Sequence, residues 1–422
     1  MASFLSFLGA ARGVTGSCYL LRHNDDALMI DCGTFQGSKE DEAKNRNRLP
    51  IDQVNLRGLV LTHGHLDHVG RAPVLAYHRY QGDVLAHPAT LDIASAILED
   101  SAKINNHAED DPLYGSDEVQ QIKKQMRAIP AYGVPMQIGP FTVELFDAGH
   151  ILGSSSVRVQ WSDRGNDRAI LFSGDLGVSG APIIRDPNTA WDPATHGVDY
   201  VVTESTYGDR VHIPRAQVRD NLRRILERSL TDGGKVLIPA FSIGRTQEVL
   251  YELNALIEAG LLPKIPVILD GPLGLSATRI YAKHTSCYDH ETMRMLERGD
   301  KPFEFDGLRR ADDASASRRA VETRGPAIVI AGSGMLQGGR IRHYLKRYLP
   351  DPTTDVILVG YQAFRTLGRA LQEGRDSVYL QGEEIPVRAR ISTLSGLSAH
   401  ADCDGLTNWF AHLPRRDDTQ VF

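Results

Sequence analysis

Hydrophobic residues in the first two hundred positions gather in short runs that predict β-strands. Examples are "ALMIDCG", "GLVLTH", "FTVELFDAG", "AILFSGD" and "VDYVVTEST", and several end in Gly, Asp, His or Thr, where a chain changes direction. Two segments between the runs, 71–81 and 88–109, have the spacing of helices. This alternation predicts sheets covered by helices, an α/β layered domain.

The pattern changes from about Ile213 onward. Segment 215–234 has apolar residues at helical spacing and ends in Gly-Gly, which is typical of an amphipathic helix. Short apolar runs then alternate with helical stretches, as in "KVLIPAF" before "GRTQEVLYELNALIEAG". This order predicts a parallel sheet with both faces covered. The polar segment 296–325 predicts a surface helix and loop.

Length and charge narrow the picture. A chain of 422 residues exceeds one ordinary core, so we expect two domains of about 150–200 residues each. The net charge of −6 argues against non-specific coating of nucleic acid, and any polyanion site must be a local basic patch. The four cysteines lack CxxC pairing and fit a reducing compartment.

The amino-terminal stretch has some resemblance to a signal sequence. It lacks a basic region, however, and its short apolar part continues into what reads as more strand. No run approaches 18 apolar residues. We therefore expect a cytoplasmic protein without membrane association.

The stretch "LVLTHGHLDHVGR" (59–71) carries the densest candidate chemistry. It places His63, His65, Asp67 and His68 directly after an apolar strand. Imidazole and carboxylate groups are the ligands that zinc-type ions prefer. A tight loop after a strand can aim His63 and His65 at one point while Asp67 and His68 turn toward another. A chance cluster of surface histidines is the alternative, and we favour a metal site.

Three more residues occupy similar turn positions. His150 in "DAGHILGSS" and Asp175 in "FSGDLG" both lie where an apolar run breaks, and are candidate ligands. Asp31 in "MIDCG" has the same placement. It is either a turn carboxylate or a group that orients a ligand histidine.

The ordered motifs "MIDCG", "THGHLDH", "AGHILGS" and "SGDLG" resemble those of the metallo-β-lactamase fold. "TESTYGDR", "PAFSIGRTQEVLYEL", "GSGMLQGGRIRHYL", "GYQAFRTLGR" and "LSGLSAHADCDGL" extend the resemblance to the β-CASP ribonucleases, over nearly the whole chain. The closest likeness is to bacterial and archaeal members and to the catalytic subunit of eukaryotic mRNA 3′-end processing.

The resemblance implies a site with two zinc ions, for which manganese is a substitute. One zinc would be held by His63, His65 and His150. The other would be held by Asp67 and His68. Asp175 would bridge the two, and Asp31 would support the ligands. Such a pair of metals clamps the attacking and leaving oxygens of a phosphodiester, and Asp67 would orient the water.

The resemblance also implies an acid for the leaving group. His400 in "LSAHAD" would touch the scissile phosphate and protonate the leaving oxygen, and Glu204 in "TESTYGD" would keep His400 protonated. A buried salt bridge between the domains is the alternative role for this pair.

Glycines and hydroxyls before two predicted helices suggest phosphate binding. The candidates are Ser333, Gly334, Thr366, Gly368 and Arg369. Ordinary strand-to-helix turns are the alternative. Arg245 and Glu248 are instead expected to pair and lock the second domain. The basic runs 309–310, 318–319 and 346–347 are expected to be solvated faces.

The sequence departs from the family pattern at a few places. The family ordinarily has a further histidine in a strand ending "VHGE", and the sequence ends at "DDTQVF", where that strand begins. Either the sequence stops short of that histidine or the ligand is absent. If it is absent, the metal at Asp67 and His68 is expected to bind more weakly. Phe364 and Arg365 stand where Glu-Gly is common, and "GSGM" replaces Ser-Ser-Gly-Met. These changes are expected to alter the grip on the substrate.

Together these features predict an α/β protein with a metallo-β-lactamase αββα sandwich over 1–208, an inserted β-CASP domain over 209–385 and a return segment over 386–422. We expect a zinc-dependent ribonuclease acting on single-stranded RNA, and a homodimer is compatible with the sequence. A DNA nuclease and a non-catalytic RNA-binding subunit are the alternatives, although the latter predicts lost ligands. An ester or thioester hydrolase would not need the "ESTYGD" and "SAHAD" motifs.

Overall fold

The computed structural model describes residues 3–108 and 111–422, and the chain divides into two compact units. The first unit is formed by the chain up to Ser179, by Arg185–Arg210 and by His400–Phe422. The second unit is formed by Gly180–Ile184 and Val211–Ala399. The second unit is therefore an insertion in the first.

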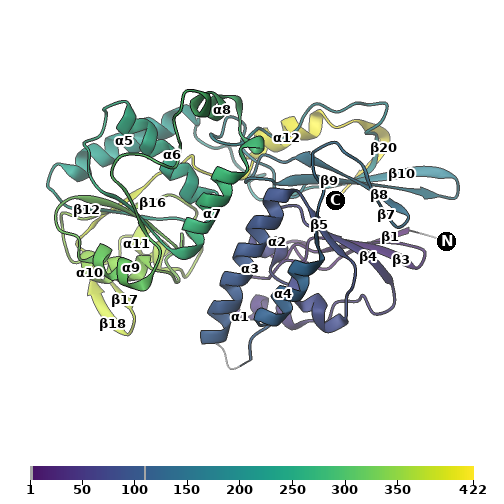
Figure 1. Cartoon of the computed structure of the whole chain (residues 1–422), viewed down its shortest axis with the longest axis horizontal. Coiled ribbons are helices and arrows are strands. Elements are labelled where there is room, and N and C mark those ends of the chain that lie inside the picture. Colours follow the sequence, from purple (N-terminus) through teal and green to yellow (C-terminus); the bar gives the residue numbers. More distant parts are fainter. Residues whose placement is uncertain (1–2, 109–110) are drawn as a thin grey trace. The chain divides into compact units, whose positions relative to one another are not determined.

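Two sheets form the first unit (Figure 1). The first sheet has the order β1-β2-β3-β4-β5-β6, antiparallel from β1 to β3 and parallel from β3 to β6. Its strands are β1 (Ser3–Phe7), β2 (Tyr19–His23), β3 (Asp26–Ile30), β4 (Asn55–Val60), β5 (Asp83–Ala86) and β6 (Met126–Ala128). The second sheet has the order β20-β11-β10-β9-β8-β7. Its strands are β7 (Met136–Ile138), β8 (Phe141–Asp147), β9 (Ser155–Asp163), β10 (Asn166–Phe172), β11 (Val198–Val202) and β20 (Arg415–Val421).

The residue alternation along the strands builds the layers. Leu28 and Ile30 face the second sheet and share a core with Val143, whereas Met29 packs with the helices on the other side. The helices of this unit are α1 (Lys39–Ala43), α2 (Leu66–Val69), α3 (Pro88–Ala108), α4 (Ser116–Gln125) and α12 (Cys403–Ala411), with 3-10 helices η1 (Lys44–Arg46) and η2 (Ala72–His78). Trp409 of α12 packs on the outer face of the second sheet. The predicted αββα sandwich is confirmed.

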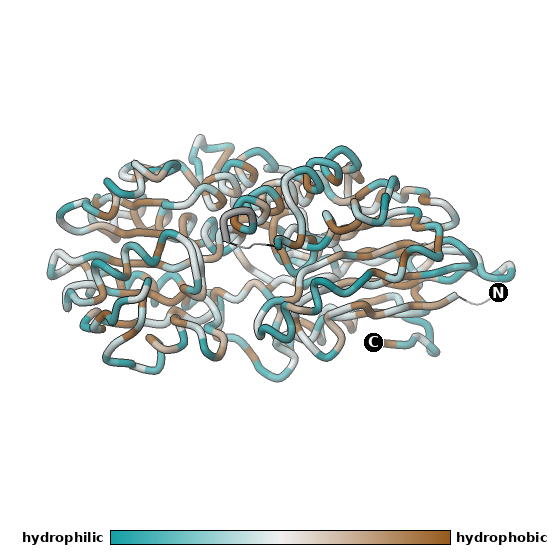
Figure 2. Tube along the Cα trace, turned by 90° about the horizontal axis from the view of Figure 1, so that it is seen from below, coloured by the Kyte–Doolittle hydropathy of each residue, from teal (hydrophilic) through white to brown (hydrophobic). Residues whose placement is uncertain are grey.

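One parallel sheet organises the second unit, in the order β14-β13-β15-β12-β16-β19. The strands of this unit are β12 (Lys235–Pro239), β13 (Val267–Asp270), β14 (Leu308–Ala311), β15 (Ala327–Ala331), β16 (Asp355–Leu358), β19 (Arg390–Thr393) and the hairpin β17 (Ser377–Leu380) and β18 (Glu383–Pro386). Its helices are α5 (Ala216–Leu230), α6 (Arg245–Glu258), α7 (Pro272–Lys283), η3 (Thr285–Cys287), α8 (His290–Glu297), α9 (Ala314–Val321), α10 (Ile341–Tyr348) and α11 (Leu367–Gln372). In Figure 2 the hydrophobic stretches follow the strands of both units.

The structure differs from the sequence-based expectation in one segment. Segment 296–325 contains the strand β14 besides the helix α9, because an edge strand buries only Ala311 and so shows no apolar run. The compact first unit resumes at His400, because β19 pairs with β16 in the parallel sheet of the second unit.

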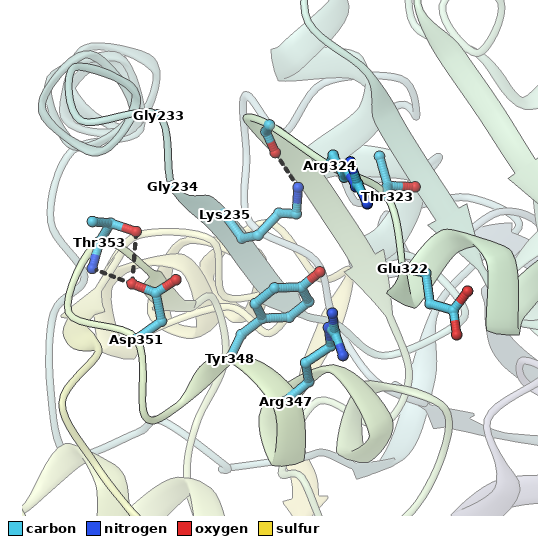
Figure 3. A pocket seen from close by; sticks show the side chains of 11 residues that line it. Gly233, Gly234, Lys235, Glu322, Thr323, Arg324, Arg347, Tyr348, Asp351 and Thr353 are labelled. Atoms are coloured by element: carbon cyan, nitrogen blue, oxygen red, sulfur yellow. Dashed lines mark hydrogen bonds between the residues drawn. The ribbon is translucent and has the colours of Figure 1, made fainter.

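A cavity of about 510 Å³ lies at the amino-terminal edge of this parallel sheet (Figure 3). The cations Lys235, Arg324 and Arg347 line it, and the Lys235 ammonium donates to the Gly325 carbonyl. Helices α5, α9 and α10 all end beside this cavity. Because the carboxyl ends of helices carry partial negative charge, these cations offset the helix dipoles and the cavity is a poor site for an anion.

Among residues 3–108 and 111–422, no helix is both long enough and apolar enough to cross a membrane.

Candidate metal centre

The loop after β4 separates the histidine cluster into two halves. Gly64 packs so closely on α3 that an added Cβ would lie 2.3 Å from the Ile93 side chain, so this turn requires glycine. His65 is still extended and precedes the short helix α2. Asp67 and His68 lie within α2 and therefore point in another direction than His63 and His65.

The first group of ligand atoms belongs to His63, His65, His150 and Asp175, all within 4.8 Å of one another. The Nδ1 atom of His65 lies 3.1 Å from Nε2 of His63 and 3.1 Å from Nε2 of His150. Ligand atoms about 2.0–2.1 Å from a tetrahedral zinc are roughly 3.3 Å apart. The spacing and the donor types of this group fit one zinc ion.

Asp175 lies between this first group and His68. Its Oδ2 atom is 3.5 Å from Nε2 of His63 and 3.6 Å from Nε2 of His150. Its Oδ1 atom is 3.3 Å from Nε2 of His68. The two oxygens of one carboxylate thus face two different sets of ligands, which is the placement that a bridging carboxylate needs.

Asp31 holds His68 in the orientation that this arrangement requires. Its Oδ2 atom lies 2.7 Å from Nδ1 of His68, which leaves Nε2 facing Asp175. The backbone N–H of Thr62 donates to Oδ1 of Asp31 at 2.8 Å, and the Thr62 hydroxyl donates to Oδ2 at 2.8 Å. Asp31 therefore sits behind the ligand histidine and fixes its tautomer.

Asp67 lies on α2 next to His68, and its carboxyl group interacts electrostatically with His68, Asp175 and His400. Burial raises the pKa of Asp67, while His68 opposes this and Asp175 adds to it. Its backbone approaches Gly33 so closely that an added Cβ there would lie 1.6 Å from the Asp67 carbonyl oxygen. The loop carrying Asp67 is therefore packed directly on the end of β3.

The electrostatics of His63 and Asp175 suit a cation. Burial alone would lower the pKa of His68, but Asp175 and Asp31 outweigh it and raise this pKa well above its ordinary value. Burial lowers the pKa of His63 well below its ordinary value, and the neighbouring imidazole of His68 lowers it further. Burial alone would raise the pKa of Asp175, but His68 and His63 outweigh it and hold this pKa well below its ordinary value. A neutral imidazole and an ionised carboxylate are the forms that bind metal.

Glu204 and His400 form a contact at the edge of the same centre. Nδ1 of His400 lies 3.2 Å from Oε2 of Glu204 and 3.9 Å from Oδ2 of Asp175. Burial alone would lower the pKa of His400, but Glu204 and Asp175 outweigh it and raise this pKa to about 9. Both residues belong to the first unit, so this ion pair lies within that unit and not between the domains.

The comparisons with known proteins agree with this geometry. Residues 11–240 match the metallo-β-lactamase superfamily, residues 246–371 the Beta-Casp domain and residues 384–422 the Zn-dependent metallo-hydrolase RNA specificity domain. Ribonuclease TTHA0252 of Thermus thermophilus is 38% identical over 407 residues, which cover 96% of this chain and 90% of that protein. The chain belongs to the β-CASP family of the metallo-β-lactamase superfamily.

Other relatives of this β-CASP chain include archaeal proteins. Transcription termination factor FttA of Pyrococcus abyssi is 30% identical, and the match covers 98% of this chain but 65% of that factor. An RNase J-like protein of Methanocaldococcus jannaschii is 28% identical, with 99% and 91% of the two chains covered. A crystal structure from Enterococcus faecalis, of a protein of unknown function, has a TM-score of 0.55 at 10% identity and shares the fold.

The predicted phosphate-binding residues of the β-CASP unit lie in two adjoining loops, after β15 and after β16. Ser333 closes the first loop on Gly338, and Thr366 caps α11 by accepting from the Arg369 N–H at 3.2 Å. An added Cβ on Gly368 would lie 1.6 Å from Gln362 Oε1. Arg369 pairs with Glu373, and the expected pair of Arg245 and Glu248 also forms.

Local contacts within the turns explain the presence of most of the predicted phosphate-binding residues. The Thr366 hydroxyl and the buried Gly368 serve the local fold, so phosphate contact would have to come from Ser333, Gly334 and the Arg369 guanidinium. Gln362 connects the loops by donating from Nε2 to the Gly334 and Gly360 carbonyls at 3.0 Å each.

Sequence reasoning missed the hydroxyl groups that support the centre. Ser17 donates to Asp31 at 3.2 Å, Thr62 donates to the same carboxylate, and the Ser173 hydroxyl accepts from the Glu204 N–H at 2.9 Å. Thr62 stands two residues after the end of β4 and Ser173 directly after β10, and both precede a ligand motif. This position is the signal that could have found them.

Asp31→Asn is expected to weaken metal binding by about 10- to 100-fold, because the amide cannot hold His68 in its ligand tautomer as the carboxylate does. Zinc titration monitored with a competing chromophoric chelator measures this affinity. Ser17→Ala removes only the 3.2 Å contact and should cost less. Equal zinc affinity in Asp31→Asn and the unaltered chain would show that Asp31 merely fills a turn.

Proposed function

We propose that this protein is a zinc-dependent ribonuclease that hydrolyses phosphodiester bonds of single-stranded RNA with two metal ions. The observation that carries the proposal is the position of Asp175, with one oxygen facing His63 and His150 and the other facing His68. Two adjacent metals suit phosphodiester hydrolysis, because one attacking and one leaving oxygen both need stabilisation.

His63, His65, His150 and Asp175 would hold one zinc, and Asp67, His68 and Asp175 the other. When bound, the two ions would supply charge neutralisation at the scissile phosphate and a lowered pKa for the attacking water. Asp67 would orient that water. His400, kept protonated by Glu204, would donate its proton to the leaving 3′-oxygen, which gives 3′-hydroxyl and 5′-phosphate ends.

The second metal is expected to bind more weakly than the first. Among the residues that the structure describes, three imidazoles and one carboxylate surround the first position, while His68 is the one imidazole beside Asp67 and Asp175 at the second. Fewer nitrogen ligands lower the affinity for zinc. Stepwise dialysis should therefore remove one zinc per chain before the other.

Several observations favour RNA over the alternatives. The match of 384–422 to an RNA specificity domain and the 38% identity to a named ribonuclease support RNA rather than DNA as the substrate. A non-catalytic RNA-binding subunit would have no need for the complete set formed by His63, His65, His150 and Asp175.

Removal of metal tests the proposal directly. Cleavage of labelled single-stranded RNA is expected to fall by at least about 100-fold after treatment with a chelator and to return with zinc or manganese, because both ions would be lost. Single-stranded DNA of the same sequence serves as the competing substrate. Persistent RNA cleavage without metal, or preferential cleavage of DNA, would contradict the proposal.

A further inference from the structure

Exposed aromatic side chains gather at the carboxyl edge of the parallel sheet in the β-CASP unit. Phe241 follows β12 and is 42% exposed, and Tyr361 and Phe364 follow the neighbouring β16 and are 58% and 77% exposed. Arg365 stands next to Phe364. We call these four residues the aromatic edge. Large apolar groups held in water at the carboxyl ends of parallel strands mark an interaction site.

The aromatic edge is held in place before any ligand arrives. Phe364 and Arg365 form the tip of a turn whose base is closed by Thr366, with its N–H donating to the Ala363 carbonyl at 3.2 Å and its hydroxyl at 2.7 Å. The buried Gln362 ties the same loop to the loop after β15. Binding to a fixed turn avoids the entropy cost of ordering it.

Phe241 is fixed by contact with glycine backbone. A Cβ added to Gly334 would lie 2.9 Å from Cδ2 of the Phe241 ring, and one added to Gly360 would lie 3.5 Å from Cε2. The ring therefore rests on the loops that follow β15 and β16. Part of its surface remains open to solvent at the same edge.

Arg365 adopts a backbone conformation that disfavours any residue with a side chain. Its φ is +65°, and it occupies the position of the turn where a glycine is preferred. Its guanidinium lies 5.4 Å from the centre of the Phe364 ring, and among residues 3–108 and 111–422 it makes no ion pair. An unpaired cation on an exposed ring, at a strained position, indicates a role in binding rather than in folding.

Planar rings beside an unpaired cation match the chemistry of single-stranded nucleic acid. Unpaired bases stack on aromatic faces, and the neighbouring phosphate needs a positive charge. In a chain with a net charge of −6, a phosphodiester strand requires such a local cation. Bases inside a duplex are already stacked and could not use these rings.

We propose that unpaired bases of the RNA substrate stack on Phe364, Tyr361 and Phe241 of the aromatic edge, while Arg365 contacts an adjacent phosphate. This proposal rests on the function proposed above. This contact would help determine how tightly the chain binds RNA and would depend little on base identity.

Substitution of Phe364 provides the test. Phe364→Ala should raise KM for single-stranded RNA about ten-fold, equivalent to about 1.4 kcal/mol, and leave kcat unchanged. Phe364→Trp should keep KM near its original value, whereas Phe364→Leu should behave like Phe364→Ala. The side chain is so exposed that none of these changes should unfold the protein. Tyr379→Ala is the matched control, because Tyr379 is 74% exposed but lies on the β17–β18 hairpin.

Arg365→Gly separates binding from stability. It should raise the unfolding temperature by relieving the strained φ, yet weaken RNA binding and reduce the slope of log affinity against log salt by about 1. Fluorescence anisotropy with a chelator present to prevent cleavage measures this binding. An Arg365→Gly chain with lower stability, or with unchanged RNA binding, would contradict the role given to Arg365.

An RNA with abasic positions distinguishes stacking from other contacts. Phe364→Ala should have no effect on binding of this strand, because there are no bases to stack. If the unaltered chain cleaves RNA and Phe364→Ala leaves KM unchanged, the role proposed for the aromatic edge is contradicted, while the proposed ribonuclease function is not. If RNA binding depends on Phe364 but the unaltered chain does not cleave RNA, the proposed ribonuclease function is contradicted, while the role of the aromatic edge in binding RNA is not. If Phe364→Ala changes the sedimentation coefficient of the protein but not its RNA binding, the aromatic edge contacts a second copy of the chain and the proposal is overturned.

Discussion

Asp175→Asn is expected to lower kcat/KM for RNA by about 10³-fold or more and to reduce the zinc content of the protein. Its two carboxylate oxygens face His63 and His150 on one side and His68 on the other, so one substitution affects both metal positions. Loss of a group that only supports a ligand typically costs 10- to 100-fold, and a shared ligand should cost more. Steady-state cleavage and metal analysis measure the two effects.

Asp199→Asn is the matched control for this substitution. Asp199 is likewise a buried aspartate, in β11 of the second sheet, but it pairs with Arg168 and Arg416 rather than with histidines. We expect Asp199→Asn to lower the free energy of unfolding and to leave the zinc content unchanged. Full zinc content and activity in Asp175→Asn would rule out the bridging role, and circular dichroism would reveal a variant that simply fails to fold.

His400→Ala is expected to lower kcat for RNA by about 10²- to 10⁴-fold while the zinc content stays the same. His400 contacts Glu204 and lies beside Asp175, and it belongs to neither group of metal ligands in the proposed site. The loss should shrink on bis(p-nitrophenyl) phosphate, because its acidic phenol leaves without protonation. This dependence on the leaving group is a result that a purely structural role would not produce.

Two further variants complete the experiment on His400. Glu204→Gln keeps the hydrogen bond but removes the charge, so we expect a smaller loss in the same direction. His412→Ala removes an exposed histidine at the end of α12 and should leave cleavage unchanged. Equal losses on RNA and on the activated diester in His400→Ala would argue against proton donation.

The sequence predicted elements well where burial leaves a clear pattern. The helix expected over 215–234 is α5 (Ala216–Leu230), and "KVLIPAF" contains β12 (Lys235–Pro239). Strand β12 is buried along its whole length and α5 buries one face, so in each the apolar spacing follows the period of the element. At the sheet edge, β14 has charged residues at Arg309 and Arg310, so its pattern resembled a polar loop.

In the site, too, the sequence identified residues that lie close together in the chain but not the contacts between distant ones. His63, His65, Asp67 and His68 could be recognised from the sequence because one loop after one strand carries them. The residues alone left Asp31 either as a turn carboxylate or as a group that orients a ligand histidine. Its contact with His68 joins residues that β3 and β4 bring together only by pairing. The aromatic edge was visible only as a departure from the family pattern at Phe364 and Arg365.

The sequence by itself determined the family, the two-part architecture and the candidate ligands, because each motif is contained in a few consecutive residues. Only the tertiary structure decided that the two oxygens of Asp175 face different ligand groups and that His400 meets Glu204 within the first unit. His400 and Glu204 are 196 positions apart in the chain. Such contacts depend on sheet pairing and packing over the whole unit, which no local pattern of residues contains.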